Sequence, residues 1–216
     1  MGFEFFDRKG EFAVRQGNNL PHWFQPGVTY FVTFRTEDSV PQTLLQSWYG
    51  RRDAWLLKHG IDPTRRDWRL KLRALPDLEA EFNAQFTREF MEYLDRGLGE
   101  CVLRKPAVAQ IVEDNLRHFD GDRYQLGDFV VMPNHVHLLV CLIGATEIEA
   151  QCTSWKHYMA GKINKAMGRR GRFWQEESFD HLVRSEEQFE NLQKYIAENP
   201  RKAGLKVGEY LHWRRE

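Results

Sequence analysis

Apolar residues alternate with other residues in several short runs, and this pattern predicts a β-sheet. Residues 28–35 alternate between two faces and predict one strand. The β-branched runs at residues 123–132 and 135–143 meet at a Pro-Asn pair, which predicts a hairpin. The second of these runs is almost wholly apolar, which favours a place near the centre of the sheet. Residues 178–184 predict a last short strand.

Apolar residues at helical spacing occupy much of the chain between these strands. Residues 43–59 predict one helix, and apolar residues at every fourth position after Pro76 predict another. Pro106 suits the first position of a third helix, because the backbone N–H of that position has no partner within the helix.

The last two helices carry signals for where they begin and end. Thr146 and Glu149 have capping-box spacing ahead of a long helix, and Ser185 and Gln188 have it ahead of the final helix. Pro200 predicts the end of the final helix, because the residue before a proline is pushed out of helical space.

This order of elements fits an α+β fold of ferredoxin-like type, a sandwich in which an antiparallel sheet carries helices on one face. No repeat, low-complexity tract or Gly/Ser-rich linker divides the 216 residues. We therefore expect a single domain over residues 1–216, with a helical insertion at about residues 51–118.

Composition favours a globular cytoplasmic protein. With 42% hydrophobic residues, the chain can bury one sizeable core. No run approaches the roughly 18 apolar residues of a membrane span, and the N-terminus carries acids where a signal peptide is basic. Cys101, Cys141 and Cys152 are odd in number and lack metal-site spacing, which is typical of reduced thiols in the cytoplasm.

Charge is balanced over the whole chain but not along it. The chain has 31 basic and 31 acidic residues, so its net charge gives no indication of nucleic acid. Residues 151–175, in contrast, contain basic residues and no acid. This strip fits a groove that follows DNA phosphates, and it fits equally a solvated helix face. Its basic residues are Lys156, Lys162, Lys165, Arg169, Arg170 and Arg172.

Two histidines stand out in the predicted central strand. Alternate side chains of a strand share a face, so His135 and His137 point the same way while Val136 points oppositely. Two imidazoles on one rigid strand are half of a site for a divalent metal. The alternative is a structural role, in which each buried ring needs a hydrogen-bond partner of its own.

The final helix offers a second candidate group. Tyr195 and Asn199 are four residues apart, so they lie on one helix face, where a phenol and an amide oxygen could act together. By itself this pair also fits core packing and a helix terminus. Tyr158 is an alternative nucleophile, but position 162, one turn further on, is a lysine rather than an amide.

Taken together, these motifs resemble a known family. His135-Val136-His137 matches the motif of HUH endonucleases, which is two histidines around a bulky apolar residue. Further segments between Leu20 and Leu205 are similar to the REP-associated tyrosine transposases (RAYTs), single-tyrosine relatives of the small insertion-sequence transposases. The resemblance is thin at residues 51–99. The similar segments are residues 20–23, 27–35, 130–140, 155–156, 173–184 and 195–205.

The resemblance implies a role for each candidate residue. His135 and His137 fall on the metal-binding histidines, Tyr195 on the nucleophile and Asn199 on the position that completes the metal site. It implies a Mg²⁺ or Mn²⁺ ion and a 5′-phosphotyrosine intermediate in the cleavage and rejoining of DNA. Because histidine and asparagine ligands are neutral, we expect the metal to bind most tightly when DNA is present.

The resemblance also implies a partner, a DNA hairpin with a single-stranded flank, and neither a membrane nor a nucleotide cofactor. Such proteins act as monomers or homodimers. Lys194 lies beside Tyr195, where it could lower the phenol pKa. Besides the basic strip, which includes Lys156, the residues expected to face DNA are Trp174, Arg184 and Lys194.

Two alternatives remain from other functional classes. A catalytically idle regulator derived from a transposase would bind hairpin DNA without cutting it. Nucleotide hydrolases of the histidine-triad type also have two alternating histidines on a strand, but Leu139 occupies the third alternate position here, which breaks that pattern.

Overall fold

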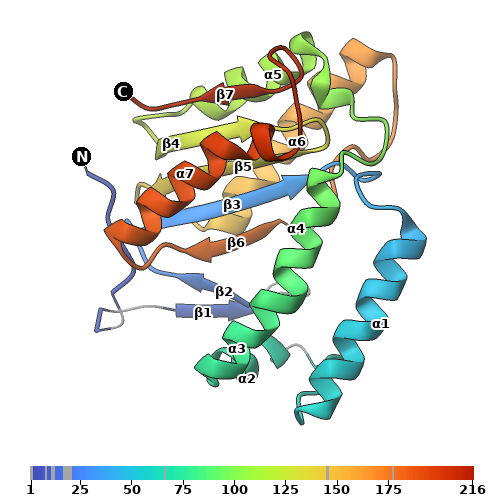
Figure 1. Cartoon of the computed structure of the whole chain (residues 1–216). Coiled ribbons are helices and arrows are strands. Elements are labelled where there is room, and N and C mark those ends of the chain that lie inside the picture. The colour runs from blue at the N-terminus through green and yellow to red at the C-terminus, as the bar shows by residue number, and fades with distance from the viewer. Residues whose placement is uncertain are drawn as a thin grey trace.

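The computed structural model is organised around a five-stranded antiparallel sheet of order β6-β3-β5-β4-β7 (Figure 1). The strands are β3 (Thr29–Arg35), β4 (Tyr124–Val131), β5 (His135–Leu142), β6 (Phe179–Leu182) and β7 (Leu211–Trp213). The structure describes residues 2–7, 9–10, 13–16, 21–65, 67–144, 146–176 and 178–216. Leu20, where the family resemblance starts, lies outside these residues. A separate hairpin pairs β1 (Ala13–Gln16) with β2 (Pro21–Phe24).

The sheet confirms the predicted α+β class and the central place of β5. Each of the strands predicted at residues 28–35, 123–132, 135–143 and 178–184 is present, with ends one or two residues shorter. β4 and β5 form a hairpin, closed by a hydrogen bond from the Met132 N–H to the His135 carbonyl (2.8 Å). β5 pairs with β3 on its other side.

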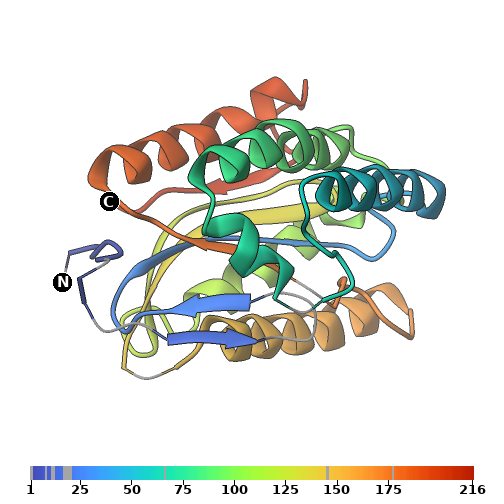
Figure 2. The same cartoon turned by 90° about the horizontal axis from the view of Figure 1, so that it is seen from below.

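Helices cover both faces of this sheet, where the sequence predicted helices on one face only. α5 and α6 pack on one face, and α7 lies on the other (Figures 1 and 2). α7 buries the second face, so the residues of β5 are buried on both sides of the sheet. The helices are α1 (Gln42–Lys58), α2 (Trp68–Arg73), α3 (Pro76–Phe82), α4 (Arg88–Asp95), α5 (Pro106–Arg117), α6 (Ile148–Met167) and α7 (Glu186–Lys202).

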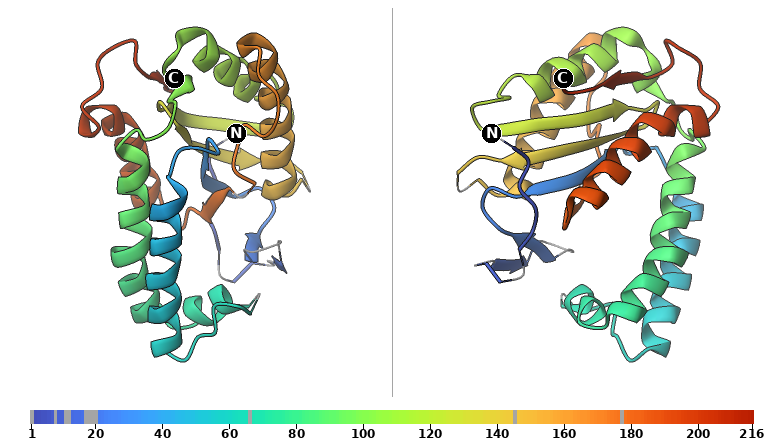
Figure 3. Two further views of the ribbon diagram at one scale, coloured as in Figure 1. Left: turned by 90° about the vertical axis from the view of Figure 1, so that its right-hand side faces the viewer. Right: turned by 60° about the vertical axis from the view of Figure 1, so that its left-hand side comes forward.

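The helical insertion forms an arm with an apolar cluster of its own. α1 runs beside α4, and both extend past the β6 edge of the sheet, on the α7 side (Figures 2 and 3). A π-helical segment, Asn83–Thr87, joins α3 to α4 in one long helix. Trp48, Leu56 and Phe86 are buried between the helices of the arm. The arm begins at α1, before the boundary expected at residue 51, and α5 belongs to the sheet core.

Of the three predictions made for the ends of α6 and α7, the structure confirms one and contradicts two. Ser185 caps α7 by accepting a hydrogen bond from the Gln188 N–H (3.1 Å). The capping box predicted at Thr146 is wrong, because α6 begins after Glu147 and has no side-chain cap. Pro200 does not stop α7, which continues to Lys202. A proline removes only one intrahelical hydrogen bond, and here the helix ends within a turn of it.

No helix among the described residues is long and apolar enough to cross a membrane. Cys101, Cys141 and Cys152 are all free thiols.

Candidate metal and tyrosine site

Strand β5 places two imidazoles on the face of the sheet that α7 covers. His135 pairs with Arg35 and His137 with Thr33 across β3, and both imidazoles are fully buried. Burial lowers the pKa of His135 to about 3 and that of His137 well below its usual value. Both rings are therefore neutral at physiological pH, which is the form that binds metals.

A hydrogen-bonded asparagine fixes the orientation of His135. The Asn134 amide donates from Nδ2 to the Leu98 carbonyl (2.9 Å), so its Oδ1 is the atom that faces His135 Nδ1 at 2.8 Å. An amide oxygen only accepts, so His135 Nδ1 must carry the proton. The lone pair of the neutral ring is therefore on Nε2, and this atom points at the candidate site.

His137 is held in the same manner by strand β3. Its Nδ1 lies 2.7 Å from the Thr33 hydroxyl, and its Nε2 lies 3.4 Å from the Tyr195 hydroxyl. The Phe31 ring stacks on the imidazole with a centroid distance of 5.4 Å. A ring that is bonded through one nitrogen and packed on one side has a single orientation, and this is how proteins hold a metal-binding histidine.

The capped helix α7 brings Tyr195 to the histidines. Its inward residues Phe189, Ile196 and Asn199 are spaced at seven and three, which puts them on one helix face, and this face packs on the sheet. The Tyr195 ring lies 5.3 Å from that of His137, between centroids. Burial raises the pKa of the Tyr195 phenol above its usual range, and the Asp95 carboxylate raises it further. The phenol is protonated until another group stabilises its anion.

Asn199 follows Tyr195 by one turn of α7, and its amide lies near enough to Asp95 and Tyr195 to lower the pKa of both side chains. It is fully buried, and neither its Oδ1 nor its Nδ2 has a hydrogen-bond partner among the described residues. A buried amide without partners costs free energy, roughly 1–3 kcal/mol for such a polar group. An unsatisfied amide oxygen therefore indicates that something else binds there.

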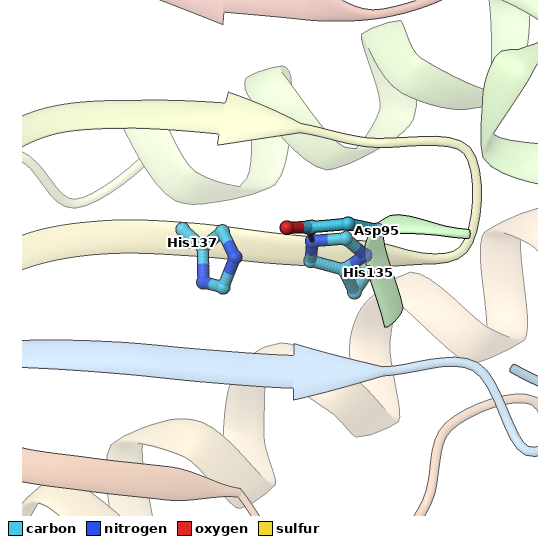
Figure 4. Close-up of side chains that lie close together, drawn as sticks. All are labelled: Asp95, His135 and His137. Carbon is cyan, nitrogen blue, oxygen red and sulfur yellow. Dashed lines mark ion pairs between the residues drawn. The ribbon is translucent and has the colours of Figure 1, made fainter. Parts of the chain in front are cut away.

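Asp95, the last residue of α4, completes this group, and sequence reasoning missed it. Its Oδ1 lies 3.7 Å from His135 Nε2 (Figure 4). Burial raises the pKa of this carboxyl to about 6, although Asn199 and Lys202 lower it. Nothing local distinguishes Asp95 from the other acids of α4. It was found only because the arm ends beside β5.

Three of the candidate ligand residues place their ligand atoms together. Asp95, His135 and His137 each offer a ligand atom within 4.8 Å of the others. Asp95 Oδ1, His135 Nε2 and both Asn199 side-chain atoms lack hydrogen-bond partners within the described residues. Two nitrogens, a carboxylate and an amide oxygen without a thiolate suit Mg²⁺ or Mn²⁺ better than a closed structural zinc site. The residues present therefore fit a divalent cation.

Two of the residues expected to face DNA are instead interior. Lys156 is 9% exposed, and its ammonium donates to the carbonyl oxygens of Gln175 (3.2 Å) and Glu176. Trp174 is 4% exposed and packs edge-on against Phe34. A lysine that supports a loop and a tryptophan in the core fit the same sequence pattern as a DNA-binding strip, so the pattern could not separate them.

The other basic residues lie on two different layers. Lys162 and Lys165 are exposed on α6, behind the sheet as seen from His137, and Arg169, Arg170 and Arg172 follow that helix. Arg184 and Lys194 are exposed on the layer of Tyr195. The alternative nucleophile, Tyr158, is 51% exposed on α6. α6 packs on the opposite face from the histidines, so Tyr158 does not reach them.

Comparison with known proteins gives one match to a family model. Residues 103–199 match the family model described as "Transposase IS200 like". Over these 97 of its 216 residues the chain is similar to the IS200-like transposases. The matched range contains both histidines, Tyr195 and Asn199, whereas Asp95 and the arm lie outside it.

One solved structure is also similar. It is described as a REP-associated tyrosine transposase bound to a REP hairpin, with 16% identity, 86% of this chain and 73% of that chain covered, and a TM-score of 0.45. Among curated proteins no match to the chain was found.

Proposed function

We propose that the protein cleaves and rejoins single-stranded DNA through a covalent bond to Tyr195. The observation that carries this proposal is the position of the Tyr195 hydroxyl, 3.4 Å from His137 Nε2, at the edge of a group of unsatisfied buried ligand atoms. A tyrosine that only filled the core would not need such neighbours. One chain supplies every group of the site.

His135, His137, Asn199 and Asp95 are the residues that would hold a Mg²⁺ or Mn²⁺ ion. When bound, such an ion withdraws charge from a phosphodiester and stabilises an anionic nucleophile. Asn134 and Thr33 keep the two Nε2 atoms directed into the site. Asp95 adds a negative charge to a ligand set that was expected to be neutral, so we propose that the ion binds before DNA arrives.

The chain's own contribution to the reaction is a positioned phenol. Tyr195 Oη forms a bond to phosphorus, and the bond from phosphorus to the 3′ oxygen breaks. The phenol loses its proton, and the leaving 3′ oxygen gains one to become a 3′-hydroxyl. The product is a 5′-phosphotyrosine. Attack by a second 3′-hydroxyl reverses the step and rejoins DNA without ATP, because the phosphodiester has been exchanged rather than hydrolysed.

The substrate follows from the family and from the motifs shared with RAYTs. We propose a short imperfect hairpin with a single-stranded flank, with cleavage in the flank. The backbone of single-stranded DNA can enter a buried site, whereas a duplex is too wide to enter it.

The decisive experiment is trapping of the covalent intermediate. Wild type, Tyr195→Phe and Tyr158→Phe would each be incubated with Mn²⁺ and a labelled pool of hairpins whose stem and flank sequences are randomised. We expect a denaturation-resistant protein–DNA adduct for wild type and Tyr158→Phe only, because only Tyr195 lies beside the histidines. EDTA should abolish the adduct.

Tyr158→Phe is the matched control, because it removes the same hydroxyl from an exposed position on the opposite layer. An adduct that survives in Tyr195→Phe, or none with wild type across the whole pool, would contradict the proposed function.

A further inference from the structure

A hollow lies between the arm and the sheet and opens at the candidate nucleophile. Its volume is about 410 Å³, within the roughly 300–1,000 Å³ range of small-ligand sites. One wall comes from α2, α3 and α4, the other from β3, β6 and α7, and Tyr195 lines it. The hollow is therefore continuous with the space in front of the Tyr195 ring.

Aromatic and flexible apolar side chains form much of both walls. Phe31 and Phe179 come from the sheet, and Phe82 and Met91 come from the arm. Phe179 and Met91 are only partly buried, so part of each side chain is accessible from the hollow. Aromatic faces in a groove of this kind are the platforms on which unpaired bases stack, whatever the sequence of the strand.

Arginines outnumber acids around this hollow and around the one that adjoins it. The adjoining hollow, of about 280 Å³, shares Phe179 and four residues of the arm with the first. Together the two are lined by six arginines and only two glutamates, in a chain whose net charge is zero. Such an excess attracts a phosphate backbone. The arginines are Arg35, Arg52, Arg69, Arg88, Arg172 and Arg184.

Arg52 is paired with Asp53 at 2.6 Å, whereas the ion pairs of Arg88 and Arg172 are exposed and leave their charge available. Arg88 lies 4.0 Å from Glu92 and Arg172 lies 3.7 Å from Glu176, and in both pairs the side chains are more than half exposed. Exposed pairs of this kind contribute little and exchange readily. Arg184 is exposed at the end of the hollow near α7.

We propose that the groove formed by these two hollows binds an unpaired DNA strand next to the bond that Tyr195 attacks, and that the arm is the clamp on that strand. This inference rests on the proposed function, since it extends the same site. It assigns the strand to the arm side of the sheet rather than to the basic residues of α6. An unpaired strand is the occupant, because a duplex is too wide for a hollow of this volume.

The test measures how much a single-stranded flank adds to affinity. Fluorescence anisotropy would give the Kd of a labelled hairpin with a ten-nucleotide flank on either end, and of the same hairpin without a flank. All variants would carry Tyr195→Phe, and the buffer would contain EDTA, so that no cleavage interferes. The variants are Phe179→Ala, Phe179→Leu, Arg184→Gln and the control Arg170→Gln.

We expect the flank to strengthen binding of the parent protein and Phe179→Ala to reduce that gain by roughly 5- to 100-fold, the cost of losing one stacked base. Arg184→Gln should make the salt dependence of log Kd shallower by about 0.7, which corresponds to one lost phosphate contact on a single strand. Arg170→Gln, which removes the same charge from an exposed residue that lines neither hollow, should leave the gain unchanged. Binding of the flankless hairpin should be the same in all variants.

Other outcomes overturn the inference. No gain from the flank in the parent protein would show that the groove does not bind a strand. A gain that Arg170→Gln removes and Arg184→Gln preserves would place the strand outside the two hollows, at the loop that follows α6. If Phe179→Ala fails to fold, Phe179→Leu and Arg184→Gln still decide the result. These measurements follow binding without cleavage. The groove can therefore fail this test while the Tyr195 adduct still forms, and it can pass this test while no adduct forms.

Discussion

The two faces of strand β5 are both buried, but one buries apolar side chains and the other buries two histidines. On one face Val136, Leu138 and Val140 pack against α5 and α6, in a core that is almost wholly apolar. On the other face His135 and His137 are equally buried, beside carboxylate and amide atoms that have no hydrogen-bond partner among the described residues. The apolar residues of the first face contribute stability, whereas the buried polar group on the second face costs it, beside an apolar cluster that includes Leu139 and Ile196.

The difference shows where the fold is adapted to a ligand. Protein interiors rarely leave several polar atoms unsatisfied at one place, because each costs free energy. A cation would satisfy the Asp95 and Asn199 oxygens and the His135 nitrogen at once. The polar atoms of the second face are therefore unsatisfied as part of a core, and together they could form the ligand set of a cation.

Truncating the apolar face should give the largest change in stability. Leu138→Ala removes a fully buried side chain, so we expect the free energy of unfolding to fall by about 2–5 kcal/mol. Denaturant unfolding in EDTA would measure it. The matched change on the other face, His137→Ala, should cost clearly less, because that ring is buried at a desolvation penalty. Equal losses would remove the distinction between the faces.

Acid should destabilise the cation-free protein through the histidines. Their pKa values are depressed in the fold, to about 3 for His135, so only the unfolded chain takes up these two protons as pH falls below 6.5. Asp95, with its pKa raised to about 6, opposes this by binding one proton in the fold. The net uptake by the unfolded chain is about one proton.

Stability should therefore fall by about 2 kcal/mol between pH 6.0 and 4.5, since one proton corresponds to about 1.4 kcal/mol per pH unit. Unfolding titrations in EDTA at several pH values would measure the slope. Relative to wild type, Asp95→Asn should make the slope of the free energy of unfolding against pH steeper. In the double variant His135→Gln, His137→Gln only Asp95 remains, so this site should then stabilise the fold as pH falls. A slope that neither variant alters would contradict the burial of these groups as neutral rings.

Neutralising the buried carboxylate should give a smaller effect of the opposite sign. In EDTA at pH 8, Asp95→Asn removes a largely buried charge whose pKa is raised by burial in spite of Lys202, so we expect the free energy of unfolding to rise by about 1 kcal/mol. Adding Mn²⁺ should reverse the order, because bound metal stabilises wild type in proportion to the logarithm of its concentration over Kd. Destabilisation in EDTA would indicate that Asp95 has a structural partner instead.

Much of this site could be predicted from the sequence because its geometry is local. Alternation on a strand puts His135 and His137 on one face, and a spacing of four puts Tyr195 above Asn199. The cap at Ser185 follows from the same short-range chemistry, and the structure confirms it. That these two pairs meet was implied by the family resemblance and not by spacing.

The rest depended on contacts between distant segments. Asp95 and His135 are 40 residues apart, and the arm that brings them together lies outside the matched family range. Thr33 is an ordinary strand residue until β3 pairs with β5. Lys156 fits a basic strip in the sequence, because sequence cannot show that a loop closes over its ammonium.

The central claim is that the arm, the central strand and the last helix share one divalent cation. Titration of Mn²⁺ into the DNA-free protein, followed by the loss of its free-ion EPR signal, tests this directly. We predict one site in wild type, weakened at least tenfold by Asp95→Asn and by His137→Ala, and unchanged by Tyr158→Phe. No binding to the wild type without DNA, or equal binding by wild type and Asp95→Asn, would contradict the account.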